Sequence, residues 1–383
     1  MTNFHFQARH KTEITTLLFR STLPVQGRVD IGPGALLSPA RFLRQGDCGK
    51  NVLVIAQRST SALFGRQLTK ALKELDLQVS FLEVPDGESA KSSGQLLAVW
   101  EKLESLSFER GDTIIALGGG AVCDLSGFAA STYLRGVRLA LIPTTLLSQV
   151  DAAIGGKTAI NLAAGKNLAG TFYFPEAVFV DPEVLSTLPE REWLSGMGEI
   201  IKYALIEKTV SAQAEYRSGP RPLFAVLQEN LANGIKWDAP SMQGIIASCI
   251  KMKLAVVGKD PLEKHLRRSL NLGHTLAHAL ETVSNYEIAH GQAVAIGLVF
   301  AMSLAVRFGR CSAAMRQSVV DLLKETGLPL EIPSSYNRQE ILKAMFQDKK
   351  RQADRLKFVL PCHEIGQVDI DSSIAFDELA ALL

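Results

Sequence analysis

The chain has 383 residues, 47% of them hydrophobic and 21% charged, and its formal net charge is +2. This length allows two domains, each with a hydrophobic core of its own. The nearly balanced charge argues against nucleic-acid or membrane-surface binding by bulk charge, so a local basic cluster is interpreted as a site for a small anion.

The cysteines and the N-terminal segment indicate a cytoplasmic protein. Cysteines stand at 48, 123, 249, 311 and 362 without a C-x-x-C motif, a pattern typical of thiols in a reducing compartment. The first residues are charged throughout and have no long apolar run, so they do not read as a secretory signal. No charge-free run of about 18 apolar residues occurs, and we therefore predict no transmembrane helix.

Strands and helices alternate in the first half of the chain. Runs rich in Val, Ile and Leu predict strands at 51–57, 78–84, 112–120, 138–145 and 177–181. Apolar residues three and four positions apart predict helices at 61–75 and 93–106. Near-continuous apolar strands in such an alternation favour a Rossmann-like parallel sheet covered by helices on both faces.

A glycine-rich turn, GGGAVCD, runs from Gly118 to Asp124 between a predicted strand and a predicted helix. Backbone N–H groups and a helix N-terminus at such a point can hold a phosphate. The full G-x-G-x-x-G pattern is not met, because Cys123 occupies its last position. A dinucleotide site and a tight turn without a ligand are both open on this motif alone.

The loop VPDGESAK places Asp86, Glu88 and Lys91 at the same expected sheet edge. Carboxylates at that edge can hold ribose hydroxyls. The local evidence by itself favours an ordinary turn at the Asp-Gly pair. The dinucleotide interpretation of this loop therefore depends on the other motifs of the chain.

The segment 143–170 reads as helix-like pieces interrupted by Gly-Gly-Lys and Gly-Lys-Asn. Lys157 and Lys166 each follow a glycine, so their ammonium groups can reach a bound anion. Asp151, Lys157 and Asn167 supply an acceptor, a cation and an amide, a set that suits a polyhydroxylated, phosphorylated substrate. Surface lysines in loops are the alternative. The scarcity of other charges in this segment favours the binding site.

The second half of the chain, from about Leu188, has mainly helical periodicity. Helices are predicted at 191–208, 242–258, 271–283 and 291–309, a surface loop at 218–224, and one late strand at 357–361. We therefore predict an α/β domain over 1–187, followed by a mainly α-helical metal-binding domain over 188–383.

Histidines cluster in the second half. His274 and His278 lie one helical turn apart, but no glutamate follows His274, so the H-E-x-x-H zinc motif is excluded. His290 follows closely, and Glu199 lies in an apolar helix where a carboxylate needs a partner. Two or three histidines and one carboxylate can hold zinc or a similar divalent ion with an open position. The spacing leaves open which residues ligate.

These motifs together resemble the 3-dehydroquinate synthase family of the sugar-phosphate cyclase superfamily, over about residues 50–361. The resemblance runs through PDGESAK, GGGAVCDLSGF, YLRG, IPTTLLSQVDAAIGGKTAIN, TLPEREWLSGMGEIIKY, RRSLNLGHTLAHALE, HGQAVAIG and DKK. It implies a lyase of the shikimate pathway of aromatic amino acid biosynthesis, with NAD and Zn²⁺ or Co²⁺ as cofactors. The substrate would be 3-deoxy-D-arabino-heptulosonate 7-phosphate and the products 3-dehydroquinate and phosphate. Transient oxidation by NAD, β-elimination of phosphate, re-reduction and internal aldol closure would follow one another.

The resemblance also implies roles for single residues. The metal ligands would be Glu199, His274 and His290. Substrate-side and catalytic groups would be Asp151, Lys157, Lys202, Lys253, Arg267, Asn271 and His278, with Asn167, Lys349 and Lys350 also binding substrate. Arg135 would reach the phosphate site of a neighbouring subunit, which implies a homodimer. Cofactor contacts would come from Asp86, Glu88, Lys91, Gly119, Gly120, Asp124, Thr144, Thr145, Lys157, Lys166 and Thr187.

One departure and three alternatives accompany the resemblance. Cys123 stands where the family usually has glycine, so it would either loosen the cofactor fit or simply pack. Sister cyclases act on other sugar phosphates, but Asn271 and His278 favour the dehydroquinate type. A polyol dehydrogenase would need net NAD turnover, and the many cations argue against it. An inactive, ligand-binding homologue is the last alternative, although every expected polar position is occupied.

Overall fold

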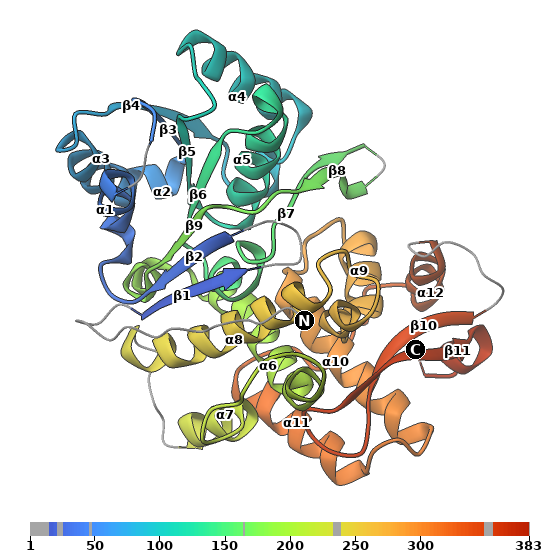
Figure 1. Ribbon diagram of the computed structural model, residues 1–383. Helices are drawn as coiled ribbons and strands as arrows, with labels where there is room; N and C mark the ends of the chain where they lie inside the picture. The colour runs from blue at the N-terminus through green and yellow to red at the C-terminus, as the bar shows by residue number, and fades with distance from the viewer. Residues whose placement is uncertain are drawn as a thin grey trace. The chain divides into compact units, whose positions relative to one another are not determined.

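The computed structural model describes residues 15–20, 26–45, 48–163, 165–232, 239–347 and 355–382. Figure 1 colours the chain by residue number, from blue at the N-terminus to red at the C-terminus. The chain divides into two compact units. Unit 1 comprises Met1–Leu188 and Trp237–Leu254, and unit 2 comprises Pro189–Lys236 and Ala255–Leu383. The predicted division into domains at 187 and 188 stays a prediction, and the segment Trp237–Leu254 of the second half belongs to unit 1.

The main sheet of unit 1 has seven strands within the described residues, in the order β1-β2-β9-β6-β5-β3-β4. Every neighbouring pair is parallel except β1 and β2. The prediction of a Rossmann-like parallel sheet is confirmed, and the hairpin of β1 and β2 adds an edge that the sequence did not reveal. The strands are β1 (Thr15–Arg20), β2 (Gln26–Ile31), β3 (Asn51–Gln57), β4 (Gln78–Val84), β5 (Thr113–Gly118), β6 (Arg138–Pro143) and β9 (Ala177–Val180).

Helices cover both faces of this sheet, as Figure 1 shows, with α1 and α3 on one side and α4 and α5 on the other. Val52 and Val54 of β3 share a buried cluster with Leu68 of α3. Leu53 and Ile55 point to the opposite face and are equally buried. The apolar runs are continuous because both faces are dry. These helices are α1 (Ser38–Gln45), α3 (Arg66–Lys73), α4 (Ser93–Ser105) and α5 (Gly120–Thr132). Two short helical turns precede α3, namely α2 (Arg58–Thr60) and η2 (Ser61–Gly65).

The expectation of helix-like pieces through 143–170 is wrong for its second part. After the turn η5 (Ser148–Ala152), β7 (Lys157–Leu162) and β8 (Gly165–Phe172) form an antiparallel hairpin. Gly155 and Gly156, at φ 98° and 70°, turn the chain into β7 with a backbone conformation that other residues rarely adopt. Strand pairing thus overrides the local helical pattern there.

Unit 2 is mainly helical, as predicted. Its late strand is one half of a hairpin, since β10 (Arg355–Pro361) pairs with β11 (Val368–Ala375), a strand missing from the sequence prediction. The predicted helix 271–283 begins only at His274, because η7 (Leu266–Asn271) precedes it. The helices of the second half are α6 (Glu190–Gln213), α7 (Leu223–Ala232), α8 (Ala239–Lys259), α9 (His274–Val283), α10 (His290–Arg307), α11 (Ala313–Glu325), α12 (Arg338–Gln347) and α13 (Phe376–Ala380).

Two helical segments, Ser241–Lys259 and His290–Arg307, are long and apolar enough to cross a membrane by length and composition alone. In each, 72% of the tested window is buried inside the structure. Core helices of globular proteins have this composition and burial, so we interpret both segments as core helices.

Candidate active site

Glu199, His274 and His290 come together in unit 2, from α6, α9 and α10. One ligand atom from each residue lies within 4.8 Å of the others. His290 Nε2 lies 3.2 Å and His274 Nε2 lies 3.4 Å from the same oxygen, Glu199 Oε1. Glu199 is fully buried. Two imidazoles and one carboxylate leave a coordination position open, which is the donor set of a catalytic divalent metal.

Glycine contacts bring the backbones carrying these ligands close together. Gly198 directly precedes Glu199, and Gly291 directly follows His290. A Cβ on Gly198 would lie only 2.3 Å from the Gly291 carbonyl oxygen. Gly273, just before His274, lies against α10, where a Cβ on Gly297 would be 2.1 Å from the Gly273 oxygen. No side chain can stand at these crossings, so glycine allows α6, α9 and α10 to bring their ligands within one coordination sphere.

The two histidines have opposite pKa shifts. Burial lowers the pKa of His274 to about 3, against the opposing attraction of Glu199. Burial also acts to lower the pKa of His290, but its contacts with Glu199 and Glu281 outweigh burial and raise it to about 10. Neutral imidazole is the ligating form, so metal binding at this cluster requires His290 to lose the proton on Nε2, the nitrogen that faces Glu199.

Lys202 and His278 lie beside the cluster. Lys202 is 1% exposed, and its ammonium pairs with Glu199 Oε2. The His278 ring lies edge-on to His274 at 5.4 Å between centroids, and His278 is not part of the three-residue group. The structure therefore separates the helical pair of histidines into one member of the cluster and one neighbour.

A second set of predicted residues follows α8 in unit 2. The carboxylate of Asp260 accepts backbone N–H groups from the turn before η7 and, at 3.1 Å, from Arg267 within η7. Burial acts to raise the pKa of Asp260, but these hydrogen bonds outweigh it and lower the pKa. Arg267 is 1% exposed. Asn271 donates to Glu263 Oε1 at 2.8 Å. A buried carboxylate thus organises the turn that carries Arg267 and Asn271.

Asp151 and Lys253 form a pair in unit 1. The Lys253 ammonium lies 3.0 Å from Asp151 Oδ1 and donates to the Asp151 backbone oxygen at 2.6 Å. Lys253 is 5% exposed, so its charge sits in a largely dry environment where such contacts are strong. The sequence predicted both residues for the site but gave no sign that they pair.

The glycine turn lies at a topological switch point of the unit 1 sheet. β4 and β5 flank β3 on opposite sides, so the chain reverses direction across the sheet there, and ligands bind at the carboxyl ends of such strands. β5 ends at Gly118 and α5 begins at Gly120. The Gly119 N–H donates to Gln57 Oε1 at the end of β3, over 3.4 Å. A Cβ on Gly119 would lie 3.1 Å from Thr145 Cγ2.

A polar network beside this turn joins several predicted cofactor and substrate residues. Lys91, 3% exposed, donates to Asp124 Oδ2 at 2.5 Å and to Asn167 Oδ1. Glu88 lies 3.8 Å from the Lys166 ammonium. Burial raises the pKa of Asp124, and the neighbouring Lys91 acts against that rise. Charged and polar side chains thus connect the loop after β4 to the helix α5 and to the hairpin β7–β8.

Other predicted cofactor residues have local partners. Asp86 accepts from the Ser59 hydroxyl at 2.6 Å, and the Thr187 hydroxyl donates to a backbone carbonyl. The Thr145 hydroxyl donates a hydrogen bond to the Ser148 hydroxyl oxygen at 2.9 Å. The buried Thr144 hydroxyl oxygen has no partner among the described residues, and so it is available to a ligand.

The remaining expectations concern two exposed residues, one buried residue and two residues outside those that the structure describes. Arg135 and Lys157 are exposed, and Lys349 and Lys350 lie outside the described residues. Cys123 is buried in α5 with its Sγ 3.9 Å from the Gly118 oxygen, and burial raises the pKa of this thiol. It therefore packs in the interior as an inert thiol.

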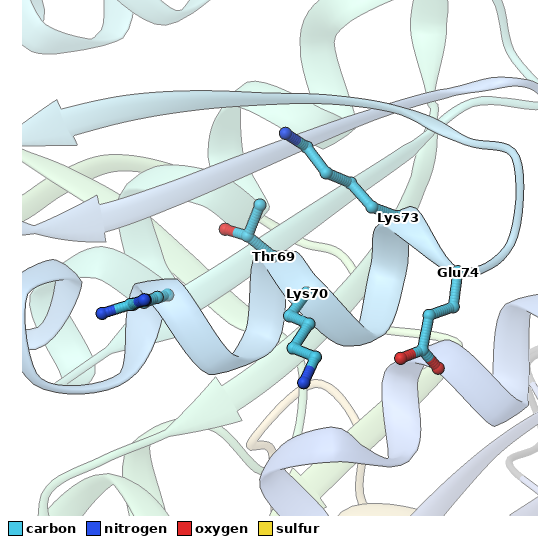
Figure 2. Close-up of a pocket in the computed structure, with 5 residues that line it drawn as sticks. Thr69, Lys70, Lys73 and Glu74 are labelled. Atoms are coloured by element: carbon cyan, nitrogen blue, oxygen red, sulfur yellow. The ribbon is translucent and has the colours of Figure 1, made fainter.

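Sequence reasoning missed Glu281, which contacts His290, and Asp260. Glu281 follows His274 by seven residues, so helical spacing places both on one face and was a usable signal. Figure 2 shows a separate open pocket along α3, where Lys70 and Lys73 point away from each other. Its residues do not converge on one point, and none of them was predicted for the site.

Comparison with known proteins identifies the family. Residues 81–195 match the family described as 3-dehydroquinate synthase N-terminal, and residues 196–351 match 3-dehydroquinate synthase C-terminal. The 3-dehydroquinate synthase of Desulforamulus reducens is 37% identical over 343 residues, which cover 89% of this chain and 92% of that protein.

Two solved structures are similar along nearly the whole chain. A 2-deoxy-scyllo-inosose synthase complexed with carbaglucose-6-phosphate, NAD⁺ and Co²⁺ has a TM-score of 0.84 and 26% identity, covering 96% of this chain and 99% of that one. A 2-epi-5-epi-valiolone synthase from Streptomyces hygroscopicus with NAD⁺ and Zn²⁺ bound has a TM-score of 0.82 and 25% identity, covering 95% and 97%. With both family domains matched and a close relative aligned over most of its length, the chain belongs to the 3-dehydroquinate synthase family.

Proposed function

We infer that this protein is a 3-dehydroquinate synthase. It converts 3-deoxy-D-arabino-heptulosonate 7-phosphate to 3-dehydroquinate and phosphate, a step of the shikimate pathway, with NAD and a divalent metal as cofactors. The observation that carries this inference is the cluster of Glu199, His274 and His290 in a chain that matches both domains of the family.

The residues of the cluster suit a divalent metal. A fully buried carboxylate and two imidazoles aimed at it form a ready set of ligands, and zinc and cobalt both accept such nitrogen and oxygen donors. Zn²⁺ or Co²⁺ is also what the two similar solved structures contain. When bound, the ion supplies Lewis-acid polarisation of a substrate oxygen.

We propose that the basic and amide residues bind the two anionic groups of the substrate, its carboxylate and its phosphate. Buried Arg267 offers a planar fork for a carboxylate, and Lys253 offers a second cation. Asp151, paired with Lys253, and Lys202, paired with Glu199, are placed to hydrogen-bond substrate hydroxyls and to hold or move a proton there. The remaining candidates for phosphate binding, each proposed from the family resemblance, are Lys157, Asn167, Asn271, His278, Lys349 and Lys350.

We propose that NAD binds at the switch point of unit 1. Gly119 and Gly120 let the pyrophosphate approach the N-terminus of α5, where backbone N–H groups favour anions. Asp86 and Glu88 are acceptors for ribose hydroxyls, since both lie in the loop after β4. NAD supplies a hydride acceptor that returns the hydride within the same turnover. Lys91, Asp124, Thr144, Thr145, Lys157, Lys166 and Thr187 would complete the cofactor site.

Replacing Gly119 with valine should weaken NAD binding about 10- to 100-fold, or about 1.4–2.7 kcal/mol. The new side chain starts 3.1 Å from Thr145 Cγ2 and fills the space that the pyrophosphate needs. Calorimetric titration with NAD measures the change. Gly94→Ala in α4, where a Cβ meets only Ser92 Oγ at 4.0 Å, is the control. An unchanged NAD affinity in Gly119→Val would place the pyrophosphate elsewhere.

Phosphate release tests the function itself. Purified protein is given 3-deoxy-D-arabino-heptulosonate 7-phosphate, catalytic NAD and Zn²⁺ or Co²⁺, with a chelator control. We expect metal-dependent release of phosphate, formation of dehydroquinate and no net accumulation of NADH. Net NADH from a polyol would instead indicate a dehydrogenase.

A sister cyclase activity is the second candidate, because the two solved structures described above are sister cyclases. It predicts phosphate release from sedoheptulose 7-phosphate, or cyclisation of glucose 6-phosphate, in place of the heptulosonate. The higher identity to a 3-dehydroquinate synthase favours the first candidate. The same assay with the three substrates decides between them.

We propose that the protein is a homodimer in which Arg135 acts across the interface. Arg135 follows Leu134, which is 44% exposed, and the nearby hairpin β7–β8 exposes Leu168 at 59% and Phe172 at 43%. The hairpin is tied to this region, since the Tyr173 hydroxyl donates to the Val137 oxygen. Exposed large apolar side chains beside a positively charged group suit an interface with a second copy.

Mixing two inactive variants tests this arrangement. Arg135→Ala inactivates the site of the neighbouring subunit, and Glu199→Ala inactivates the site of its own subunit. In a mixed dimer, the subunit with Arg135→Ala keeps its own Glu199 and receives Arg135 from its partner, so one site is intact. After denaturation and joint refolding, we expect about a quarter of the wild-type activity to return. Each variant refolded alone serves as the baseline. If Arg135 acts within its own subunit, no activity returns on mixing.

We propose a cytoplasmic location. Cys48, Cys123, Cys311 and Cys362 are thiols in the structure, as expected in a reducing compartment. Fractionation of cells followed by the phosphate-release assay checks this. Activity confined to a membrane or secreted fraction would contradict it.

A further inference from the structure

We propose that Glu281 is a positioning residue for the metal ligand His290. Glu281 Oε1 lies 3.4 Å from His290 Nδ1, while Nε2 of the same ring faces Glu199 Oε1 at 3.2 Å. The imidazole is therefore held between two carboxylates, one at each nitrogen. This inference rests on the proposed metal site, and it assigns Glu281 to the shell behind the three ligands.

The fold places Glu281 there through the turn between α9 and α10. Glu281 lies near the end of the helix that begins with His274, and His290 is the first residue of the next helix. Asn285 and Tyr286 adopt left-handed conformations at φ 47° and 65°, which reverse the chain. The Tyr286 N–H donates to the Glu281 backbone oxygen at 2.7 Å. The tight turn thus returns His290 to the side chain of Glu281.

The chemistry of a histidine ligand explains why the carboxylate belongs there. A ligating imidazole must present a lone pair on one nitrogen, and a partner that accepts the N–H of the other nitrogen fixes that tautomer and the ring orientation. His274 has such a partner, since its Nδ1 lies 3.1 Å from the Leu272 oxygen. Glu281 supplies the equivalent acceptor for His290, with a negative charge that also makes the ring a stronger donor to the metal.

The burial of Glu281 supports the same role. The residue is 8% exposed, and a buried carboxylate is costly unless it is paired. Glu281 lies outside the group of three potential ligand atoms around the cluster. Because Glu281 faces Nδ1 and the cluster faces Nε2, the carboxylate is placed to orient the ring from the side opposite the cluster.

The test is the affinity of purified metal-free protein for Co²⁺, measured by chelator competition and by the visible absorption of bound Co²⁺. We expect Glu281→Ala to bind Co²⁺ about 10- to 100-fold more weakly, with an altered spectrum, and Glu281→Gln to fall in between. Saturating Co²⁺ should restore most of the phosphate release in both variants. Glu287→Gln, an exposed carboxylate in the same turn, should leave affinity and spectrum unchanged.

The outcomes separate this inference from the proposed function. Wild-type affinity and spectrum in both Glu281 variants would overturn the positioning role and leave the synthase assignment intact. Failure of the wild-type protein to bind Co²⁺ would overturn the metal site and this inference with it. If Glu281→Ala does not fold, Glu281→Gln, which keeps the side-chain volume, gives the decision: weakened binding supports the role and unchanged binding refutes it.

Discussion

Replacing Glu199 with alanine should abolish metal binding and reduce the rate of phosphate release by about 1,000-fold or more, equivalent to about 4 kcal/mol of transition-state stabilisation. Glu199 Oε1 is the atom that both His274 Nε2 and His290 Nε2 face. Its removal leaves two imidazoles without the anionic ligand, and two neutral ligands rarely retain a divalent ion. Metal content after dialysis and steady-state phosphate release measure the two effects.

The same substitution also leaves Lys202 with a buried charge, because its ammonium pairs with Glu199 and the residue is only 1% exposed. Breaking such a pair can cost about 3–5 kcal/mol of stability. Glu199→Gln keeps the side-chain volume, and thermal unfolding shows whether either variant is folded. His363→Asn, at an exposed turn with φ 56°, is the matched control, since asparagine tolerates this conformation. Full activity in a folded Glu199 variant would remove this residue from the metal site.

Replacing Gly198 with alanine should destabilise the protein by about 1–3 kcal/mol and weaken Co²⁺ binding by about tenfold or more. The added Cβ would lie 2.3 Å from the Gly291 carbonyl oxygen, so the backbones of α6 and α10 must move apart. Glu199 and His290 each adjoin one of these glycines, and the separation would pull the two ligands apart. Thermal unfolding of the metal-free protein and Co²⁺ titration measure the two consequences.

Gly244→Ala provides a control of opposite sign for this substitution. Gly244 lies in α8 with nothing within 4 Å of an added Cβ. Alanine in a helix interior is more favourable than glycine by about 0.5–1 kcal/mol, so this variant should be slightly more stable with unchanged metal affinity. An unchanged unfolding temperature in Gly198→Ala would show that the close crossing of α6 and α10 is not needed to build the site.

The sequence alone determined the elements that local patterns encode. The strands predicted at 51–57 and 78–84 became β3 and β4 with the predicted bounds. The run of β3 is nearly all apolar because this strand is buried on both faces, whereas β4, at the edge of the sheet, is only partly buried. The helices of the second half were equally visible, because apolar spacing records the buried face. The motifs around Glu199, His274 and His290 were enough to suggest the family that the comparisons then identified.

Only the tertiary structure decided what depends on contacts between distant segments. Glu199 and His290 are 91 positions apart, so no spacing rule could reveal that they contact each other, or that His278 stands beside the cluster. Glu281 needed the turn between α9 and α10 to reach His290. The hairpin β7–β8 contradicted a local helical pattern, because strand pairing with backbone hydrogen bonds outweighs weak propensity. Local sequence thus encodes the elements and the chemical groups, while packing of backbones at Gly198, Gly273, Gly291 and Gly297 brings three metal-ligand candidates together.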